Sequence, residues 1–427
     1  MPADMQPATG TLRWRIATLL TVAIAISYLD RQTLSVAIKA IQHDIPMSNT
    51  QFAQLQSAFL ITYGLMYAGG GKLIDVLGTR RGFFLIMVFW SIACATHGLA
   101  GGFGMLAVSR LLLGAGEGGG FPAVTKAVAE WFPARERSTA MGMINAGTAV
   151  GAVAAPPLIA AIIGSVGWRW VFFVTGGMGL VWTLWWLRDY HAPSEHPRIS
   201  GSERAYLAHV LAPTTHDTTH VPWLTLFAFR ETWGIVFAKF LSDAAWYFYL
   251  FWLPKYLYDV RGFDTKQVGY FAWIPYAAAG VGALTGGWFS SHLLSRGLSL
   301  NASRKIVLGL SAALMPVIIF VTRSPIELTI VLFSIAFFGQ QSWSTLVMIL
   351  PTDLFPRRVV ASVAGLVGCG GAMGGVVFGQ IAGRMLDDGT GYGPVFAAVS
   401  TFHVLAFILI MFTVRNVRPL PLGGVPQ

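Results

Sequence analysis

The sequence predicts an all-α polytopic membrane protein whose twelve helices form two six-helix halves. Hydrophobic residues make up 55% of the 427 residues and charged residues only 11%, whereas soluble domains carry about 25% charged residues. A membrane-spanning helix needs about 20 apolar residues, and on that basis we expect twelve spans. The net charge of +10 is dispersed in short clusters between the apolar runs. This dispersal indicates membrane orientation and argues against a nucleic-acid surface.

The expected spans fall into two sets of six, separated by a polar stretch that contains prolines, histidines and one expected surface helix. The first set is 14–37, 52–74, 82–100, 105–131, 138–163 and 168–187. The second set is 230–257, 268–294, 306–321, 326–350, 360–386 and 395–414. The predicted units are a tail at 1–12, an N-terminal half at 13–187, a linker at 188–228, a C-terminal half at 229–415 and a tail at 416–427.

The loops on one side of the predicted membrane carry most of the lysine and arginine residues. These include Arg13, Arg15, Arg188, Arg304 and Arg415, and both tails and the linker lie on the same side. Because cytoplasmic loops are enriched in Lys and Arg, we expect both termini and the linker to be cytoplasmic.

An internal repeat relates the two halves. The segment EWFPARERSTAMG, which begins at Glu130, aligns without gaps on DLFPRRVVASVAG, which begins at Asp353, and the same register places Gly151 on Gly374. Two parallel six-helix halves joined by a linker are typical of secondary transporters, which bind their substrate between the halves near the membrane midplane.

The loop between the second and third spans reads GKLIDVLGTRR and is the predicted cytoplasmic gate. Its residues are Gly71, Asp75, Gly78, Arg80 and Arg81. Glycine permits close packing and a tight turn, and the acid and bases can join the ends of neighbouring helices. The alternative is an ordinary solvated, positively charged loop. The spacing resembles the loop signature of the major facilitator superfamily and so implies the major facilitator fold.

Charged residues inside the apolar runs are the strongest functional signal. Asp30 and Arg31 interrupt the first span, and Arg110 and Glu117 lie two turns apart on one face of the fourth. A charge at the bilayer centre costs about 2.5–3.5 kcal/mol, so such residues face a bundle interior or a watery cavity. The fourth span also contains five glycines, at 114, 116, 118, 119 and 120. Because glycine has no side chain, another helix or a ligand can approach the backbone closely there. The alternative is a structural ion pair between helices.

Other polar and aromatic residues complete the candidate substrate site. Lys239 and Asp243 share a face of the seventh span, where they either bind substrate or lock each other. The other candidates are Tyr63, Asn145, Trp246, Gln340, Gln341 and Ser342. Each could instead make an ordinary interhelical hydrogen bond, and Trp246 could belong to an aromatic belt at the membrane surface. Cys94 and Cys369 lie in apolar runs and are interpreted as packing residues.

These motifs resemble the anion:cation symporter branch of the superfamily. The resemblance rests on Tyr-Leu-Asp-Arg in the first span, on Arg110 and Glu117 followed by Phe-Pro, and on EWFPARERS. The seventh span is similar to bacterial hexuronate and galactonate transporters in the segment that begins at Lys239, KFLSDAAWYFYLFWLPKYL. It implies that Asp30 and Glu117 exchange protons, that Arg31 and Arg110 organise coupling and bind carboxylate, and that Tyr63 contacts substrate. Lys239 with Asp243 follows the hexuronate pattern, whereas Asp30 follows the galactonate pattern.

The predicted function is therefore proton-coupled uptake of an organic anion, a sugar acid, across a bacterial inner membrane by alternating access. The expected partners are the anion, protons and the lipid bilayer, and we expect a monomer without cofactor or metal. The alternatives are an exchanger, a carrier of a sulfonate or dicarboxylate, a membrane sensor and a membrane-embedded enzyme. The absence of metal-ligand spacing or a nucleophile elbow argues against the enzyme.

Overall fold

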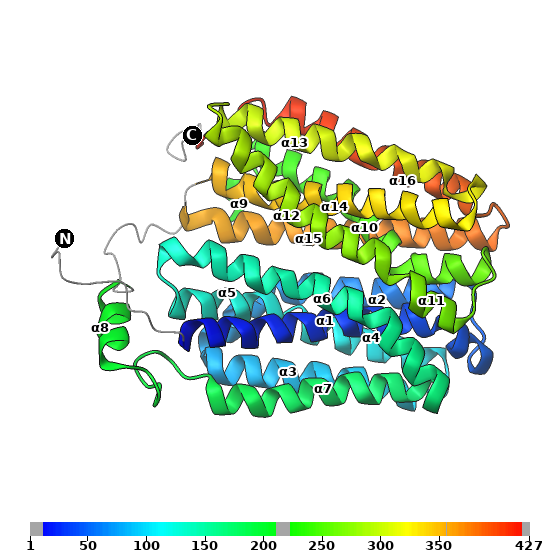
Figure 1. Ribbon diagram of the computed structural model, residues 1–427, viewed down its shortest axis with the longest axis horizontal. Coiled ribbons are helices and arrows are strands. Elements are labelled where there is room, and N and C mark those ends of the chain that lie inside the picture. The colour runs from blue at the N-terminus through cyan, green and yellow to red at the C-terminus, as the bar shows by residue number, and fades with distance from the viewer. Residues whose placement is uncertain (1–11, 211–222, 356, 421–427) are drawn as a thin grey trace.

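The computed structural model describes residues 12–210, 223–355 and 357–420, and every regular element in them is a helix (Figure 1). The N-terminal half contains α1 (Leu12–Asp44), α2 (Asn49–Leu77), α3 (Thr79–Thr96), η1 (His97–Leu99), α4 (Phe103–Glu117), α5 (Gly120–Trp131), α6 (Ala134–Val166) and α7 (Trp168–Asp189). The linker contains α8 (Gly201–Val210) and α9 (Trp223–Leu226). The C-terminal half contains α10 (Arg230–Asp259), α11 (Thr265–Phe271), α12 (Trp273–Ser295), α13 (Leu300–Leu314), η2 (Met315–Arg323), α14 (Ile326–Leu354), α15 (Arg357–Asp387) and α16 (Tyr392–Thr413).

Eight helical segments among the described residues are long and apolar enough to cross a membrane. They are Leu12–Asp44, Thr79–Leu99, Thr139–Val166, Trp168–Asp189, Leu300–Arg323, Ile326–Leu354, Ser362–Asp387 and Tyr392–Thr413. The other four expected spans coincide with α2, with α4 and α5, with α10, and with α11 and α12. The count of twelve therefore stays a prediction.

Three expected spans are not continuous α-helices. In the fourth, α4 ends at Glu117 and α5 begins at Gly120, and in the eighth α11 ends at Phe271 before α12 begins. The ninth continues beyond α13 as the 3-10 helix η2, with a proline at its start. The break in the fourth span lies where it meets α2, because a Cβ at Gly118 would lie 2.5 Å from the carbonyl oxygen of Tyr63. These glycines thus bring another helix close.

The two halves repeat the same packing between their first and fifth helices. A Cβ at Gly151 of α6 would lie 2.1 Å from the carbonyl oxygen of Ala25 on α1. A Cβ at Gly374 of α15 would lie 2.0 Å from the carbonyl oxygen of Phe240 on α10. Any side chain at either position would separate the helices, so the repeat predicted from sequence is confirmed at these two glycines.

The halves are held together at the end of the bundle remote from the linker, here called the far end. Asp387, at the end of α15, accepts the backbone N–H groups of Asn49 and Thr50 at the start of α2, at 2.8 and 2.7 Å. Tyr258 of α10 donates to the carbonyl oxygen of Val36 on α1 at 2.6 Å. A carboxylate is well placed at a helix N-terminus, where N–H groups lack helical partners.

The opposite end, which carries α8 (Figure 1), is here called the linker end. The helices α2, α6 and α15 contact the other half near the far end. Toward the linker end, each of them carries a glycine that has no such contact. A Cβ at Gly71, Gly142 or Gly365 would meet no other described atom within 4 Å. At these three positions the described residues of the two halves do not touch.

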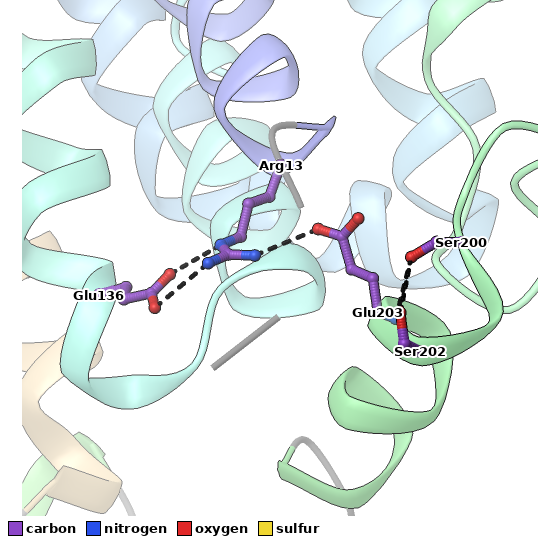
Figure 2. Close-up of polar contacts among 5 residues, drawn as sticks. All are labelled: Arg13, Glu136, Ser200, Ser202 and Glu203. Carbon is purple, nitrogen blue, oxygen red and sulfur yellow. Dashed lines mark hydrogen bonds and ion pairs between the residues drawn. The ribbon is translucent and has the colours of Figure 1, made fainter. Parts of the chain in front are cut away.

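The surface helix expected in the linker is present as α8, and it is attached to the N-terminal half (Figure 2). Arg13 of α1 lies between two glutamates: its Nε is 2.8 Å from Glu136 Oε2, and its Nη1 is 3.2 Å from Glu203 Oε1. Ser200 Oγ accepts the backbone N–H of Glu203 at 3.1 Å, which supports the first turn of α8. The linker helix therefore joins the starts of α1 and α6.

Candidate functional site

Arg31 of α1 and Glu117 of α4 form a buried ion pair in the N-terminal half. Arg31 Nε donates to Glu117 Oε2 at 2.7 Å, and both residues are 2% exposed. Ser27, one turn before Arg31, donates its hydroxyl to the same carboxylate oxygen at 2.8 Å. The other carboxylate oxygen, Oε1, has no hydrogen-bond partner among the described residues. Glu117 therefore has one satisfied oxygen and one available oxygen.

Aromatic rings surround the guanidinium group of Arg31. Its carbon lies 4.4 Å from the ring centre of Tyr63 and 4.7 Å from that of Tyr28. Tyr247, on α10 of the other half, also interacts electrostatically with Arg31. Aromatic faces stabilise a cation that has lost its water. The predicted substrate residues Arg31 and Tyr63 thus lie together where the two halves meet.

Asp30 points away from Arg31 and into the N-terminal half. It is fully buried, and its Oδ1 accepts the thiol of Cys94 on α3 at 3.5 Å. The Cys94 sulfur is also 3.3 Å from Thr175 Oγ1 on α7. The cysteine is free, but it does more than fill space, because it donates to a buried acid. Asp30 and Glu117 interact electrostatically.

Arg110 does not form an ion pair with Glu117; the pair that joins two helices here is Arg31 of α1 with Glu117 of α4, so the alternative of a structural ion pair between helices still stands. Arg110 is fully buried, and none of its three guanidinium nitrogens has a hydrogen-bond partner among the described residues. It interacts electrostatically with Cys94, Glu117 and Asp30. A buried guanidinium without a hydrogen bond is costly, so Arg110 is poised to take an acceptor.

Lys239 and Asp243 of α10 do lock each other, with Lys239 Nζ 2.9 Å from Asp243 Oδ1. The lysine also donates to Ser344 Oγ of α14 at 2.8 Å. Asp243 interacts electrostatically with Tyr28 of the N-terminal half. The pair therefore faces the aromatic residues around Arg31 across the boundary between the halves. Both interpretations of the pair, substrate binding and a lock within α10, remain predictions.

The tenth span presents its polar residues to different neighbours. Gln340 contacts the ring of His403 on α16, and Ser342 accepts from Ser311 of α13 at 2.8 Å. Ser342 therefore packs against α13, whereas His403, the partner of Gln340, interacts electrostatically with Lys239. Gln340 and Gln341 lie four and three residues before Ser344, which binds Lys239, so both lie on the face of α14 that carries Ser344. Gln340 and Gln341 are thus the residues of this group on the side of the substrate cluster.

Trp246 and Asn145 also differ in placement. Trp246 is buried within the C-terminal half, where its ring meets Phe337 edge-on at 5.7 Å. It does not belong to an aromatic belt at the membrane surface. Asn145 of α6 is exposed and lies one turn before Ala149. A Cβ added at Gly280 of α12 would lie 3.0 Å from the Cβ of Ala149. Asn145 thus faces the opposite half beyond the point where the halves touch.

The predicted gate residues lie at the linker end. Gly78 has φ 77°, a left-handed conformation that favours glycine, and it allows α3 to start directly after α2. Arg80 donates to the carbonyl oxygen of Leu187 on α7 at 2.5 Å, and Arg81 is exposed. Gly71 lies on α2, as does Asp75, whose side chain is outside the described part. The predicted gate residues are thus on the same side of the bundle as the linker helix α8.

Sequence reasoning did not include several residues of the cluster in the site. Ser27, Tyr28, Tyr247 and Ser344 each contact or face a predicted site residue, and Cys94 was interpreted as packing only. Ser27 and Tyr28 precede the Asp30–Arg31 pair by less than one turn, and that proximity is the signal that could have identified them. For Ser344 and Cys94, only the arrangement of neighbouring helices reveals the role.

Comparison with known proteins identifies relatives along nearly the whole chain. The family model of the Major Facilitator Superfamily matches residues 20–379. The hexuronate transporter of Escherichia coli K12 is 32% identical over 95% of this chain and 94% of its own. The galacturonate transporter of Dickeya chrysanthemi is 34% identical over 71% of this chain and 89% of its own.

A solved structure has the same fold. It is a bacterial homologue of the human lysosomal transporter Spinster in an inward-facing and occupied conformation. It superposes with a TM-score of 0.74 at 17% identity and covers 96% of this chain and 98% of that one.

Proposed function

From the premise that this chain belongs to the major facilitator superfamily, and is thus a multi-pass membrane transporter, we propose that it couples uptake of a sugar acid to protons. The preferred substrates are hexuronates such as galacturonate and glucuronate, which the names of the two relatives support. The observation that carries the proposal is the buried Arg31–Glu117 pair, because it joins a carboxylate binder to a group that can exchange a proton.

The substrate carboxylate is received by Arg31. A guanidinium group holds a carboxylate through two parallel hydrogen bonds, and Arg31 Nη2 has no partner among the described residues. Tyr63 and Tyr28 cover its faces and keep its edge available. The sugar hydroxyls then extend toward Lys239, Asp243 and Gln341 of the other half, where an ammonium donates and a carboxylate accepts.

Proton uptake follows from competition for Arg31. When the substrate carboxylate takes the guanidinium, Glu117 loses its cation and becomes a buried carboxylate beside Ser27 alone, so it binds a proton. Substrate and proton therefore favour each other's binding, and this coupling acts equally in both directions. Asp30 is the second proton carrier, and Arg110 supplies the positive field that Asp30 and Glu117 share. No cofactor or metal takes part.

Transport proceeds by rocking of the halves about this site. The linker end is cytoplasmic because its loops carry most of the arginines. The hydrogen bonds at the far end then close the outer side, and the separated helices at the linker end open the site inward. We place this arrangement in the inner membrane of a bacterium, with twelve spans and as a monomer.

Counterflow into proteoliposomes tests the proposed substrate class. Vesicles are preloaded with unlabelled galacturonate, glucuronate, galactonate, a sulfonate or a dicarboxylate, and entry of labelled galacturonate is followed. We expect strong counterflow with both hexuronates. Counterflow driven by the sulfonate or the dicarboxylate, and not by the hexuronates, would favour a carrier of another organic anion.

A further inference from the structure

A small notch with a mostly apolar lining and a few charged groups lies on the outer surface of the N-terminal half at the linker end. It has a volume of about 160 Å³ and is formed by three elements: the start of α1, the end of α7 and the linker. Its lining residues are Leu12, Arg15, Ile16, Thr18, Trp185, Asp189 and Arg198. The substrate cluster lies in the interior near the boundary of the halves, so the notch is a separate feature.

The notch carries an excess of positive charge. Asp189 is its acid, and it is bound by Arg198 and lies 4.0 Å from Arg188. Arg15 is exposed and forms no ion pair or hydrogen bond with other described residues. Two guanidinium groups, Arg15 and Arg198, and the carboxylate of Asp189 leave one formal positive charge in the lining. An anion of one charge is the ligand that this balance favours.

The surface next to the notch is apolar. Val181 and Leu184, one to two turns before Asp189 on α7, are 67% and 68% exposed. Trp185, on the same helix, itself lines the notch, and its indole N–H donates to Asp189 Oδ2 at 2.9 Å. Exposed apolar residues on a membrane-spanning helix face acyl chains, and tryptophan is enriched where chains meet headgroups. The ligand therefore has an apolar part beside its charge.

The linker wall of the notch is held in place by contacts on its other side. His196, two residues before Arg198, contacts the carbonyl oxygen of Asp189 at 3.1 Å, and its ring meets Trp131 edge-on at 5.5 Å. Farther along, Glu203 binds Arg13, which is engaged with Glu136 (Figure 2). The notch is thus formed without the ligand, and Arg13 is not one of its binding groups.

We propose that this notch binds the phosphate of an anionic phospholipid, such as phosphatidylglycerol, from the leaflet on the linker side. The phosphate lies between Arg15 and Arg198, and an acyl chain lies along Val181 and Leu184. Arginines beside a membrane surface each contribute about 1 kcal/mol to the binding of anionic lipid. Loss of Arg15 alone therefore weakens binding about fivefold.

The test uses the purified full-length protein in nanodiscs of phosphatidylcholine with increasing phosphatidylglycerol, and it measures the rise of the thermal unfolding midpoint. We expect the half-saturating lipid fraction to increase about fivefold in Arg15→Gln and to recover in Arg15→Lys. The control is Arg323→Gln, an exposed arginine at the far end, which should behave as wild type. Equal midpoints of all variants in pure phosphatidylcholine confirm that folding is unaffected.

Two results would overturn the proposal. One is an equal response of wild type and Arg15→Gln to phosphatidylglycerol. The other is a full response to inorganic phosphate or glycerol 3-phosphate in pure phosphatidylcholine, which would assign the notch to a free anion. Because the readout is stability and not transport, the outcome is independent of which substrate the protein carries.

Discussion

Arg31 donates to Glu117 across 2.7 Å, and this pair leaves Arg110, two turns before Glu117 on α4, without that carboxylate. The two arginines of the site therefore have different roles. Arg31 is already paired and lies among aromatic rings at the boundary of the halves, where a substrate can displace its partner. Arg110 is fully buried, and its three guanidinium nitrogens have no hydrogen-bond partner among the described residues, so we expect it to take an acceptor during transport.

Replacing Glu117 by glutamine should separate transport from proton coupling. The amide keeps the shape and can still contact Ser27, but it cannot bind a proton. We expect Glu117→Gln to retain counterflow of labelled hexuronate and to lose accumulation driven by a pH gradient, both measured in proteoliposomes. Gradient-driven accumulation at the wild-type level would remove Glu117 from the proton path.

Replacing Arg110 by lysine tests whether its planar group is needed. Lysine keeps the charge but loses the forked geometry with five N–H donors. We expect uptake of a carboxylated substrate to be abolished while the amount of protein in the membrane is unchanged. Uptake at wild-type rates would show that the positive charge at this position is sufficient and that the forked geometry is not needed.

Lys239 and Asp243 are predicted to select among sugar acids. If they read the sugar, Lys239→Gln should change the order in which galacturonate, glucuronate and galactonate inhibit labelled uptake, with proton coupling preserved. The control is the double replacement of both residues by neutral polar side chains. An identical inhibition order in wild type and Lys239→Gln would mean that the 2.9 Å pair only stabilises α10 and its contact with Ser344.

Asp387 should hold the far end closed. Asp387→Asn keeps the size but loses the charge that favours the N-terminus of α2, so the outer side should open more often. We expect a cysteine at Ala53, a fully buried residue beside Gly383 at this contact, to be labelled several-fold faster by a membrane-impermeant thiol reagent.

The neighbouring acid provides the control for that experiment. Asp388 is exposed, and Asp388→Asn removes the same charge one residue away without touching the hydrogen bonds of Asp387. It should leave labelling unchanged. Equal acceleration by both variants, or by neither, would contradict a specific role for the Asp387 cap.

The sequence predicted the parts of the site that depend on charge inside an apolar run. Asp30, Arg31, Arg110 and Glu117 are all buried, as the cost of a charge in the bilayer requires. The repeat could also be predicted from sequence. Close approach of two helices requires glycine, and Gly151 and Gly374 occupy equivalent positions in the two halves. These signals are local in the chain.

The direction of polar side chains on membrane helices was not readable. Lipid and protein interior are both apolar, so the pattern of hydrophobic residues does not tell which face meets a neighbour. Gln340, Gln341 and Ser342 consequently look equivalent in sequence, although helix rotation directs Gln340 to His403 and Ser342 to Ser311. The break after Glu117 was missed for a similar reason, since glycines are also common in unbroken membrane helices.

The most direct test of proton-coupled hexuronate uptake is accumulation of labelled galacturonate in proteoliposomes with an imposed pH gradient, acidic outside. Proton coupling predicts accumulation above the external concentration, which collapses with a protonophore and does not change when sodium is replaced by potassium. Accumulation that persists with the protonophore and requires sodium would contradict it.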